Sequence, residues 1–401
     1  MPIPLSAKAI LAINAGSSNI KLALFQPGHT PERVFEGCVD GIGTGSGCFS
    51  MSGATAGETF SRHFGIPERF NAAQVLMDWL AERIDPESLG AIGHRVVHGG
   101  PAYWEPQALT VAMRQDLQKL SSFDPEHLPL ELLMIDSLHL RFPAVPQIAC
   151  FDTAFHHTMP RVARLIPIPR RYEAHGVRRY GFHGLSCAFL LDELERLAGR
   201  PVARGRVILA HLGGGASITA VRDGKSIDTS MGLTPASGLP MASRSGDLDP
   251  GLAWYLARTE QMNAAQFNHM VNHDSGLLGI SETSGDMRAL LAAQEEDTRA
   301  AEAVAVFCYQ ARKTVCAMAG ALEGVDTLVF SGGIGEHTPE VRARICQGLG
   351  FLGIELDPER NAQDAPVISS ETSAVRVRVI HTDEQLIIAQ HARRVLQRDG
   401  A

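Results

Sequence analysis

The sequence predicts an α/β fold built from two related halves, because glycine-rich turns recur directly after apolar strands. Residues 10–13 lead into a turn at 14–19, and residues 207–210 lead into a turn at 211–217. Both of these turns continue into another apolar strand, whereas a third turn, at 331–336, leads into a helix. Turns of small residues expose backbone N–H groups and let a phosphate chain come close. Together they predict a nucleotide held between duplicated halves.

Other phosphate-binding motifs fit the sequence less well. Gly-Lys-Ser at 224–226 resembles the end of a P-loop, but Thr219 stands where that motif requires glycine. Residues 223–224 fit a hairpin turn better. The dinucleotide fingerprint fails at Thr338, where its third glycine belongs.

The predicted elements of the N-terminal half alternate between strands and helices. An apolar stripe at helical spacing predicts a helix at 74–84. The other expected elements are short hairpin strands and loops at 41–57, strands at 91–97 and 146–151, and an amphipathic helix at 128–140. The proline- and arginine-rich segment 160–171 suggests an irregular crossover, and the change of domain is placed near it.

The second half restarts the pattern and ends in a helix. Its expected helices are 186–197, closed by Gly199, then 301–322 and 383–397; its expected strands are 207–210, 218–222, 225–228, 327–330 and 375–380. Thr382 and Gln385 fit a capping box for the last helix. This alternation implies an α/β fold with ligands in the cleft between the halves.

Length, composition and charge place the chain among globular proteins of two or three domains. It has 401 residues, of which 45% are hydrophobic and 20% charged. A net charge of −8 without a basic run argues against nucleic acids and membranes as partners. Seven scattered cysteines without a Cys-x-x-Cys pair indicate reduced thiols and a cytoplasmic location. We expect no signal peptide at residues 1–4 and no membrane span, since Arg312 and Lys313 interrupt the longest apolar helix.

Charged side chains stand where predicted strands or helices end or begin. Arg95 lies in an apolar run, Asp152 directly follows a strand, Arg244 lies in a loop, and Glu384 opens the last helix. Phosphoryl transfer needs this inventory of cations for the transferred group and carboxylates for Mg²⁺. Each residue also has a structural interpretation: Arg95 could pair with a buried carboxylate, Asp152 could cap a loop, and Glu384 suits a helix N-terminus.

Three histidines are candidates for a catalytic or metal-binding role. His183 lies between glycines and bulky side chains in 180–184, but a lone histidine is more often simply hydrogen-bonded. His94 and His98 are four residues apart on a predicted strand with no glutamate between them, so a zinc site is not expected.

Six segments resemble the acetate kinase (acetate/propionate kinase) family in order and spacing over nearly the whole chain; they are 13–18, 93–100, 151–156, 179–184, 246–251 and 382–384. The resemblance implies an actin-like, sugar-kinase-like fold of two duplicated ribonuclease-H-like domains, with an interdomain active-site cleft and usually in a homodimer. The implied domains are residues 1–155 plus 384–401, to which the last helix returns, and residues 156–383. The second domain would carry the nucleotide-binding turns and the dimer interface.

The resemblance also implies roles for individual residues. The implied catalytic residues are Asp152, His183, Arg244 and Arg95. The two arginines would grip the substrate carboxylate and the transferred phosphoryl group, and His183 would stabilise that group in flight. Mg²⁺, or Mn²⁺, would be organised by Asn14 and Glu384, together with Asp152. The implied reaction is direct in-line transfer from ATP, as co-substrate, to a carboxylate, which gives an acyl phosphate and ADP.

Two further sets of residues would bind the substrates. The carboxylate substrate would contact Arg95, Val97, Phe182, Pro235 and His127. The nucleotide would contact Lys21, His211, Gly213, Gly214, Gly215, Asp286, Met287, Arg288, Gly332, Gly333, Ile334 and Gly335.

The chain departs from the family pattern near the expected pocket. Gly214 stands where the family has asparagine, and Glu126 replaces a leucine that lines the acyl pocket. Residues 185–187 and Ser237 also differ from the family. A carboxylate beside a methyl group is costly unless it turns away or is paired. The resemblance implies acetate as the leading acceptor, and because of these departures propionate or another short-chain carboxylate is kept as the alternative.

A hypothesis from another class is a non-enzymatic, actin-like nucleotide switch. It is less favoured, because a switch would need only the nucleotide residues, whereas this chain retains Arg95, Asp152, His183, Arg244 and Glu384.

Overall fold

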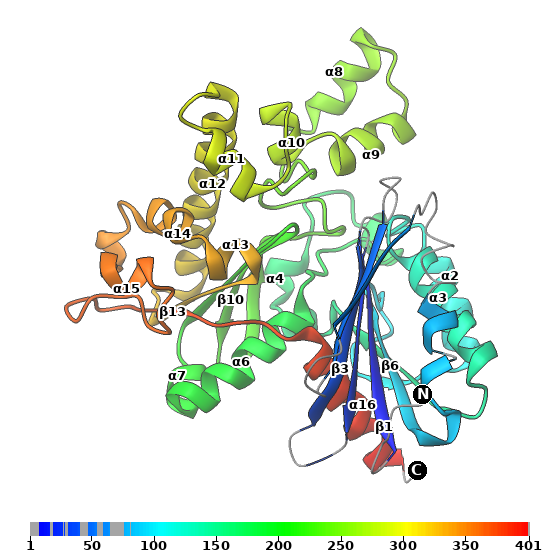
Figure 1. Ribbon diagram of the computed structural model, residues 1–401. Coiled ribbons are helices and arrows are strands. Elements are labelled where there is room, and N and C mark those ends of the chain that lie inside the picture. Colours follow the sequence, from blue (N-terminus) through cyan, green and yellow to red (C-terminus); the bar gives the residue numbers. More distant parts are fainter. Residues whose placement is uncertain are drawn as a thin grey trace. The chain divides into compact units, whose positions relative to one another are not determined.

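The computed structural model describes residues 8–16, 19–26, 28, 31–40, 47–53, 59–64, 76–80 and 82–399. The chain forms two compact units, each with its own β-sheet (Figure 1). Unit 1 comprises Met1–Ala154 with Asp383–Ala401, and unit 2 comprises Phe155–Thr382. Unit 1 is therefore discontinuous in sequence.

Within the described residues, the sheet of unit 1 has eight strands. They are β1 (Ala9–Ala15), β2 (Asn19–Gln26), β3 (Glu32–Asp40), β4 (Gly47–Gly53), β5 (Thr59–Phe64), β6 (Leu89–Val96), β7 (Gln107–Ala108) and β8 (Gln147–Phe151). Their order across the sheet is β5-β4-β3-β2-β1-β6-β8-β7. Neighbours from β5 to β1 are antiparallel, β1, β6 and β8 are mutually parallel, and β7 is antiparallel to β8.

Helices cover this sheet. They include α2 (Val111–Leu120), α3 (Leu128–Arg141), α16 (Glu384–Asp399) and the short η1 (Pro86–Ser88). α16 contacts β1, β2, β6 and β8. Gly93 on β6 allows this close approach, because a Cβ atom there would lie 2.6 Å from Ile388 Cγ2. The last helix thus packs on the strands that carry the N-terminal site residues.

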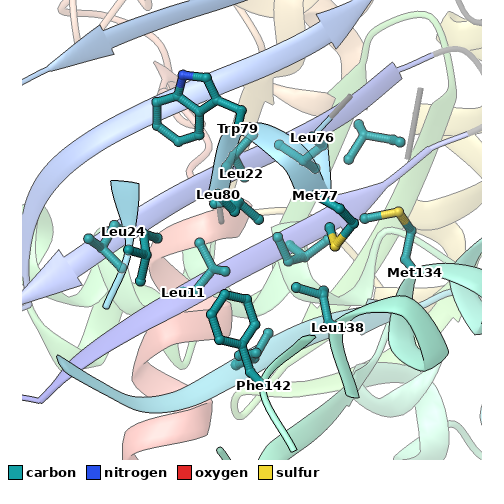
Figure 2. Close-up of a cluster of buried hydrophobic side chains, with 14 of the residues drawn as sticks. Leu11, Leu22, Leu24, Leu76, Met77, Trp79, Leu80, Met134, Leu138 and Phe142 are labelled. Atoms are coloured by element: carbon teal, nitrogen blue, oxygen red, sulfur yellow. The ribbon is translucent and has the colours of Figure 1, made fainter. Parts of the chain in front are cut away.

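The core of unit 1 contains large aliphatic and aromatic side chains (Figure 2). Leu11, Leu22 and Leu24 from β1 and β2 alternate along their strands, as expected for one face of a sheet. They lie in one cluster with Trp79 from the helical residues 76–80 and with Leu138 from α3. This packing fixes β1 and β6, and therefore the strand ends where Asn14 and Arg95 stand.

The sheet of unit 2, whose residues are all described, has five strands. They are β9 (Val207–Leu212), β10 (Ala216–Arg222), β11 (Lys225–Thr229), β12 (Thr327–Ser331) and β13 (Arg376–Val379), in the order β11-β10-β9-β12-β13. β11, β10 and β9 are antiparallel neighbours, whereas β9, β12 and β13 are parallel. Strands β3-β2-β1-β6-β8 of unit 1 have the same order and directions. This shared topology confirms the predicted duplication.

The helices of unit 2 are numerous and mostly short. They are η2 (Ala154–Thr158, at the boundary), α4 (Arg161–Arg164), α5 (Arg171–Ala174), α6 (Gly184–Ala198), α7 (Arg200–Ala203), α8 (Gly251–Thr259), α9 (Ala264–His273), α10 (Gly276–Ser281), α11 (Met287–Ala293), α12 (Thr298–Leu322), α13 (Gly332–His337), α14 (Pro339–Cys346), η3 (Gly350–Leu352) and α15 (Pro358–Ala362). The long helix α12 packs against β9, β10 and β11. Across the described residues, no helix is long and apolar enough to cross a bilayer.

Most predicted strands and long helices are confirmed to within a few residues, including the hairpin turn at 223–224, where both residues have positive φ. The segment 160–171 contains two short helices, α4 and α5. Residues 17–18, 41–46, 54–57, 74–75 and 81, and the chain start at 1–4, lie outside the described residues. The predictions made there concern the first turn, the glycine-rich stretch, the start and one interior residue of the helix at 74–84, and the expected absence of a signal peptide.

The predicted capping box at Thr382 is wrong. α16 begins at Glu384, and the Asp383 side chain accepts the capping hydrogen bond from the Leu386 N–H at 3.0 Å. The Thr382 hydroxyl instead lies 2.9 Å from Ser186 Oγ. Asp383 therefore caps α16, the role that the sequence spacing had assigned to Thr382.

Candidate active site

A buried arginine between two carboxylates dominates the site residues of unit 1. Arg95 Nη2 lies 3.0 Å from Asp152 Oδ2, and its Nη1 lies 3.0 Å from Glu131 Oε1. β6 and β8 are parallel neighbours, so Arg95 and the residue that follows β8 meet at the same edge of the sheet. Burial alone would lower the pKa of Arg95, but the charges of Asp152 and Glu131 raise it above its ordinary value.

The two predicted metal residues of unit 1 are in direct contact. The Asn14 amide donates to Glu384 Oε2 at 2.6 Å, because α16 packs against the strand that carries Asn14. The Ala15 carbonyl, next in the chain, lies 3.5 Å from Arg95 Nη1. Lys21 stands opposite Asn14 in the β1–β2 pair and is exposed. Asn14, Lys21, Arg95, Asp152 and Glu384 therefore gather around one end of the sheet.

The donor set at this end suits Mg²⁺ held mainly through the phosphates of a nucleotide. Mg²⁺ takes oxygen ligands, keeps several waters and commonly uses one or two carboxylates with substrate phosphates. Asp152 and Glu384 supply carboxylates, and Asn14, whose amide nitrogen donates to Glu384, supplies an amide oxygen. In the described part of the chain, no three His, Cys, Asp or Glu side chains form a cage for a metal ion.

His127 is held by an aspartate that sequence reasoning did not single out. His127 Nδ1 lies 2.8 Å from Asp124 Oδ1, and both side chains are buried. Burial would raise the pKa of Asp124, but the hydrogen bond and charge of His127 lower it below its ordinary value. The neighbouring Glu126 is half-buried, and its backbone N–H donates to the same Asp124 oxygen at 3.2 Å.

Glu131 is the principal site residue that sequence reasoning missed. It faces inward from α3 and also accepts a 2.9 Å hydrogen bond from the Val97 N–H. The available signal was a glutamate between leucines 130 and 132 in an apolar helix. A charge in such a run is rarely buried without a partner.

In unit 2, His183 and Arg244 flank one glycine turn. A Cβ atom at Gly215 would lie 3.1 Å from His183 Nε2 and 3.6 Å from Arg244 Nη1. His183 has a left-handed backbone with φ 57° and precedes α6, and its Nδ1 lies 2.9 Å from Ser217 Oγ. The His183 and His211 rings are 4.3 Å apart at their centroids. The backbone of turn 213–215 thus lies beside both proposed phosphoryl-binding groups.

The second glycine turn adjoins the first because β12 and β9 are parallel neighbours. Ser331 pairs with His211, and a Cβ atom at Gly213 would lie 3.9 Å from the Gly333 nitrogen. Gly332 has φ +75°, and a Cβ there would lie 2.7 Å from the Leu212 carbonyl, so only glycine fits. Turns 213–215 and 332–335, the latter including Ile334 and Gly335, form one glycine-rich surface.

The segment that carries Asp286, Met287 and Arg288 joins this surface through one loop residue. The Ala242 N–H donates to the Gly214 carbonyl at 3.2 Å, and a Cβ at Gly285 would lie 2.7 Å from the Ala242 carbonyl. Asp286 caps α11 by accepting from the Arg288 and Ala289 N–H groups. The predicted nucleotide residues of unit 2 are therefore neighbours.

The predicted acyl-pocket residues lie in both units. In unit 2, Arg244 Nη1 donates to the Pro235 carbonyl at 3.3 Å, and the buried Phe182 accepts from His156 Nε2 through its carbonyl at 2.9 Å. In unit 1, Val97 is buried beside Glu131. That the two groups converge on one site stays a prediction.

The two sheets with shared strand order and the paired glycine turns define a mixed α/β fold of the kind that solved acetate and propionate kinases have. A model of the Acetokinase family matches residues 9–390, and this chain belongs to that family. The acetate kinase of Rhodopseudomonas palustris is 42% identical over 396 residues, which cover 96% of this chain and 98% of that protein.

Solved structures agree with this assignment. A propionate kinase from Francisella tularensis has a TM-score of 0.89 at 35% identity, and an acetate kinase from Porphyromonas gingivalis has a TM-score of 0.86 at 34% identity. Each match covers 97% of this chain and 100% of the other.

Proposed function

We propose that this protein is an acetate kinase, which transfers the terminal phosphoryl group of ATP to acetate and gives acetyl phosphate and ADP. The observation that carries the proposal is the retention of phosphoryl-transfer groups in a chain of the acetokinase family. Arg95 and Asp152 form an ion pair in unit 1, and His183 and Arg244 flank the Gly215 turn in unit 2. The reaction is reversible, because ATP and acetyl phosphate are both anhydrides and either can donate its phosphoryl group.

Each charged group has a distinct part in the transfer. The Arg95 guanidinium binds the acetate carboxylate, and Arg244 binds the phosphoryl group. When Ser217 donates to His183 Nδ1, the neutral imidazole carries its proton on Nε2, beside the glycine turn, where it donates to a phosphoryl oxygen. Asn14, Asp152 and Glu384 would hold Mg²⁺, or Mn²⁺, together with the nucleotide phosphates. The metal, when bound, neutralises charge on those phosphates.

A hydroxamate assay tests the proposal. Purified protein is incubated with ATP, Mg²⁺ and formate, acetate, propionate, butyrate or a dicarboxylate, and hydroxylamine traps any acyl phosphate. Acetate should give the highest kcat/KM, with propionate as the second acceptor, in line with the propionate kinase among the similar structures. ATP binding without acyl hydroxamate from any acid would favour the nucleotide switch. A more efficient acid than acetate would revise the acceptor.

We propose that the protein forms a homodimer through unit 2. Helices α8 and α9 bury none of their side chains, and Trp254 and Tyr255 are 66% and 56% exposed. Tyr309 on α12 is 57% exposed. Exposed aromatic groups of this size are typical of protein interfaces. Light scattering should give twice the chain mass, and Trp254→Glu should give monomers, with Trp104→Glu on unit 1 as the control.

The proposed setting is the cytoplasm, with small molecules rather than nucleic acids or membranes as ligands. All seven cysteines lie in described residues and are free thiols, which suits a reducing compartment. The net charge of −8 opposes binding to polyanions. Fractionation of cells that express the tagged full-length chain tests the location.

A further inference from the structure

Glu131 connects the two parts of the site that recognise a carboxylic acid. Its Oε1 lies 3.0 Å from Arg95 Nη1, the cation assigned to the acid group. Its Oε2 accepts a 2.9 Å hydrogen bond from the N–H of Val97, the residue assigned to the acyl pocket. The Glu131 side chain is only 2% exposed, so water does not replace either contact easily.

The Glu131 carboxyl group shares its arginine with a second buried carboxylate. Arg95 is shared with Asp152, which lies 3.0 Å from the other Nη atom and is fully buried. One guanidinium cannot neutralise two buried carboxylates, so one of them is favoured in its protonated form. Burial raises the pKa of Glu131 to about 8, against the lowering effects of Arg95 and the Val97 N–H.

The charged surroundings of Glu131 come from several elements. Arg95 on β6 and Asp152 after β8 face it, and Asp124, just before α3, adds a negative charge. Glu384 at the start of α16 acts on the shared Arg95. At neutral pH, a protonated Glu131 leaves Arg95 with one buried counter-charge, so the cation retains attraction for a substrate carboxylate.

We propose that Glu131 is a positioning residue for acid recognition. It fixes the Arg95 guanidinium and the Val97 backbone relative to each other, so that the carboxylate and the acyl tail of one substrate molecule can be bound at the same time. The inference rests on the proposed function, because it assigns Arg95 and Val97 to the acid. Glu131 acts through these two residues and need not touch the substrate. Its ionisation places a negative charge beside the arginine and weakens carboxylate binding.

The test compares Glu131→Gln and Glu131→Ala with Asp136→Asn, a matched control on the same helix that removes the partner of Arg114 instead. KM for acetate and for ATP, and kcat, are measured from pH 6 to pH 9. Wild-type kcat/KM for acetate should fall as pH rises through about 8. Glu131→Gln, which keeps one acceptor and cannot ionise, should flatten this fall.

Glu131→Ala should raise the acetate KM by about 10-fold or more, since it removes two hydrogen bonds, one to a charged group, while the ATP KM stays within about 2-fold. Asp136→Asn should resemble the wild type. If Glu131→Ala does not fold, the pH profile of Glu131→Gln decides. An unchanged profile in a folded Glu131→Gln overturns the inference and leaves the proposed function intact. A wild-type chain that forms no acyl phosphate overturns both.

Discussion

The Asn14 side-chain amide donates a 2.6 Å hydrogen bond to the Glu384 carboxylate, which joins two residues 370 positions apart. The contact exists because α16 packs on β1, and it brings together the amide and the carboxylate that are proposed to hold Mg²⁺ with the nucleotide phosphates.

Glu384→Ala should therefore increase the Mg²⁺ concentration needed for half-maximal activity by about 10–100-fold, the scale typical of residues that support a metal site. Acetate KM at saturating Mg²⁺ should change much less. Mg²⁺ titrations of the initial rate measure the effect, with Glu371→Gln, an exposed carboxylate paired with Arg360, as the control. An unchanged Mg²⁺ dependence would leave Glu384 with a structural role alone, in the first turn of α16 and in its contact with Asn14.

Arg244→Ala should lower kcat by about 10³-fold, because the guanidinium beside Gly215 is proposed to neutralise charge that develops on the phosphoryl group. Arg244→Lys should recover only part of this loss, since the planar fork is absent. Arg206→Ala removes an arginine from an exposed pair with Asp326 and serves as the control. A near-normal rate for Arg244→Ala would leave it a structural residue that binds the Pro235 carbonyl.

His183→Ala should lower kcat by about 10²–10³-fold, the usual loss for one donor to a developing negative charge. The ATP dissociation constant should change by less than about 3-fold, because the contact is strongest in the transition state. Single-turnover rates and fluorescence titration with a nucleotide analogue separate the two effects. His139→Ala, an exposed change on α3, controls for expression and handling. An equal loss in binding and rate would contradict the proposed role.

Glu126→Leu should change acetate kcat/KM by less than about 3-fold. Glu126 is half-buried within the Asp124–His127 turn, and a side chain there can turn toward water at less cost than a carboxylate can be buried. Kinetics with acetate and propionate provide the measurement. A gain of 10-fold or more for either acid would show that the carboxylate faces the acyl tail, and would revise the preferred acceptor.

Acid should destabilise unit 1 through two buried histidines. Burial lowers the pKa of His94 from 6.5 to about 4 and that of His391 to about 3. The unfolded chain therefore binds more protons below pH 6.5, so stability is fully present above pH 6.5 and falls until about pH 4 for His94 and about pH 3 for His391. His94 alone contributes up to about 3 kcal/mol of this fall. Urea unfolding at pH 7.5, 6.0 and 5.0 should show a smaller loss for His94→Asn than for the exposed control His269→Ala.

Local patterns predicted most elements because strands and long helices carry apolar periodicity. The exceptions have physical reasons. Helices α8 and α9 were not predicted although Leu252 and Leu256, and Phe267 and Met270, have helical spacing, and these apolar side chains are only partly buried in the fold. The first glycine turn was predicted only from its position between two apolar strands, and Ser17 and Ser18 within it lie outside the described residues. Sequence spacing could not predict side-chain contacts between distant segments. Thr382, for example, contacts Ser186 instead of capping the helix that follows it.

The candidate site could also be predicted only in part. Family motifs indicated Arg95, Asp152 and Glu384, but they gave no sign of Glu131, whose importance arises only when α3 is laid against β6. A buried pair of this kind depends on three-dimensional packing. Nothing in the spacing of residues 95 and 131 reveals it.

The discontinuity of unit 1 sets an order of events during synthesis. Residues 155–382 are contiguous, so unit 2 can fold as a translating ribosome lengthens the chain. Unit 1 waits for its closing helix, because α16 packs on β1 and β6 and is synthesised after all of unit 2. A ribosome that stalls before codon 384 leaves a nascent chain with an uncovered sheet and an Asn14 that lacks its carboxylate partner. Quality control acting on such chains meets exposed apolar strands, whereas a chain that includes α16 gains the cover of β1 and β6 and the carboxylate partner of Asn14 in a single step.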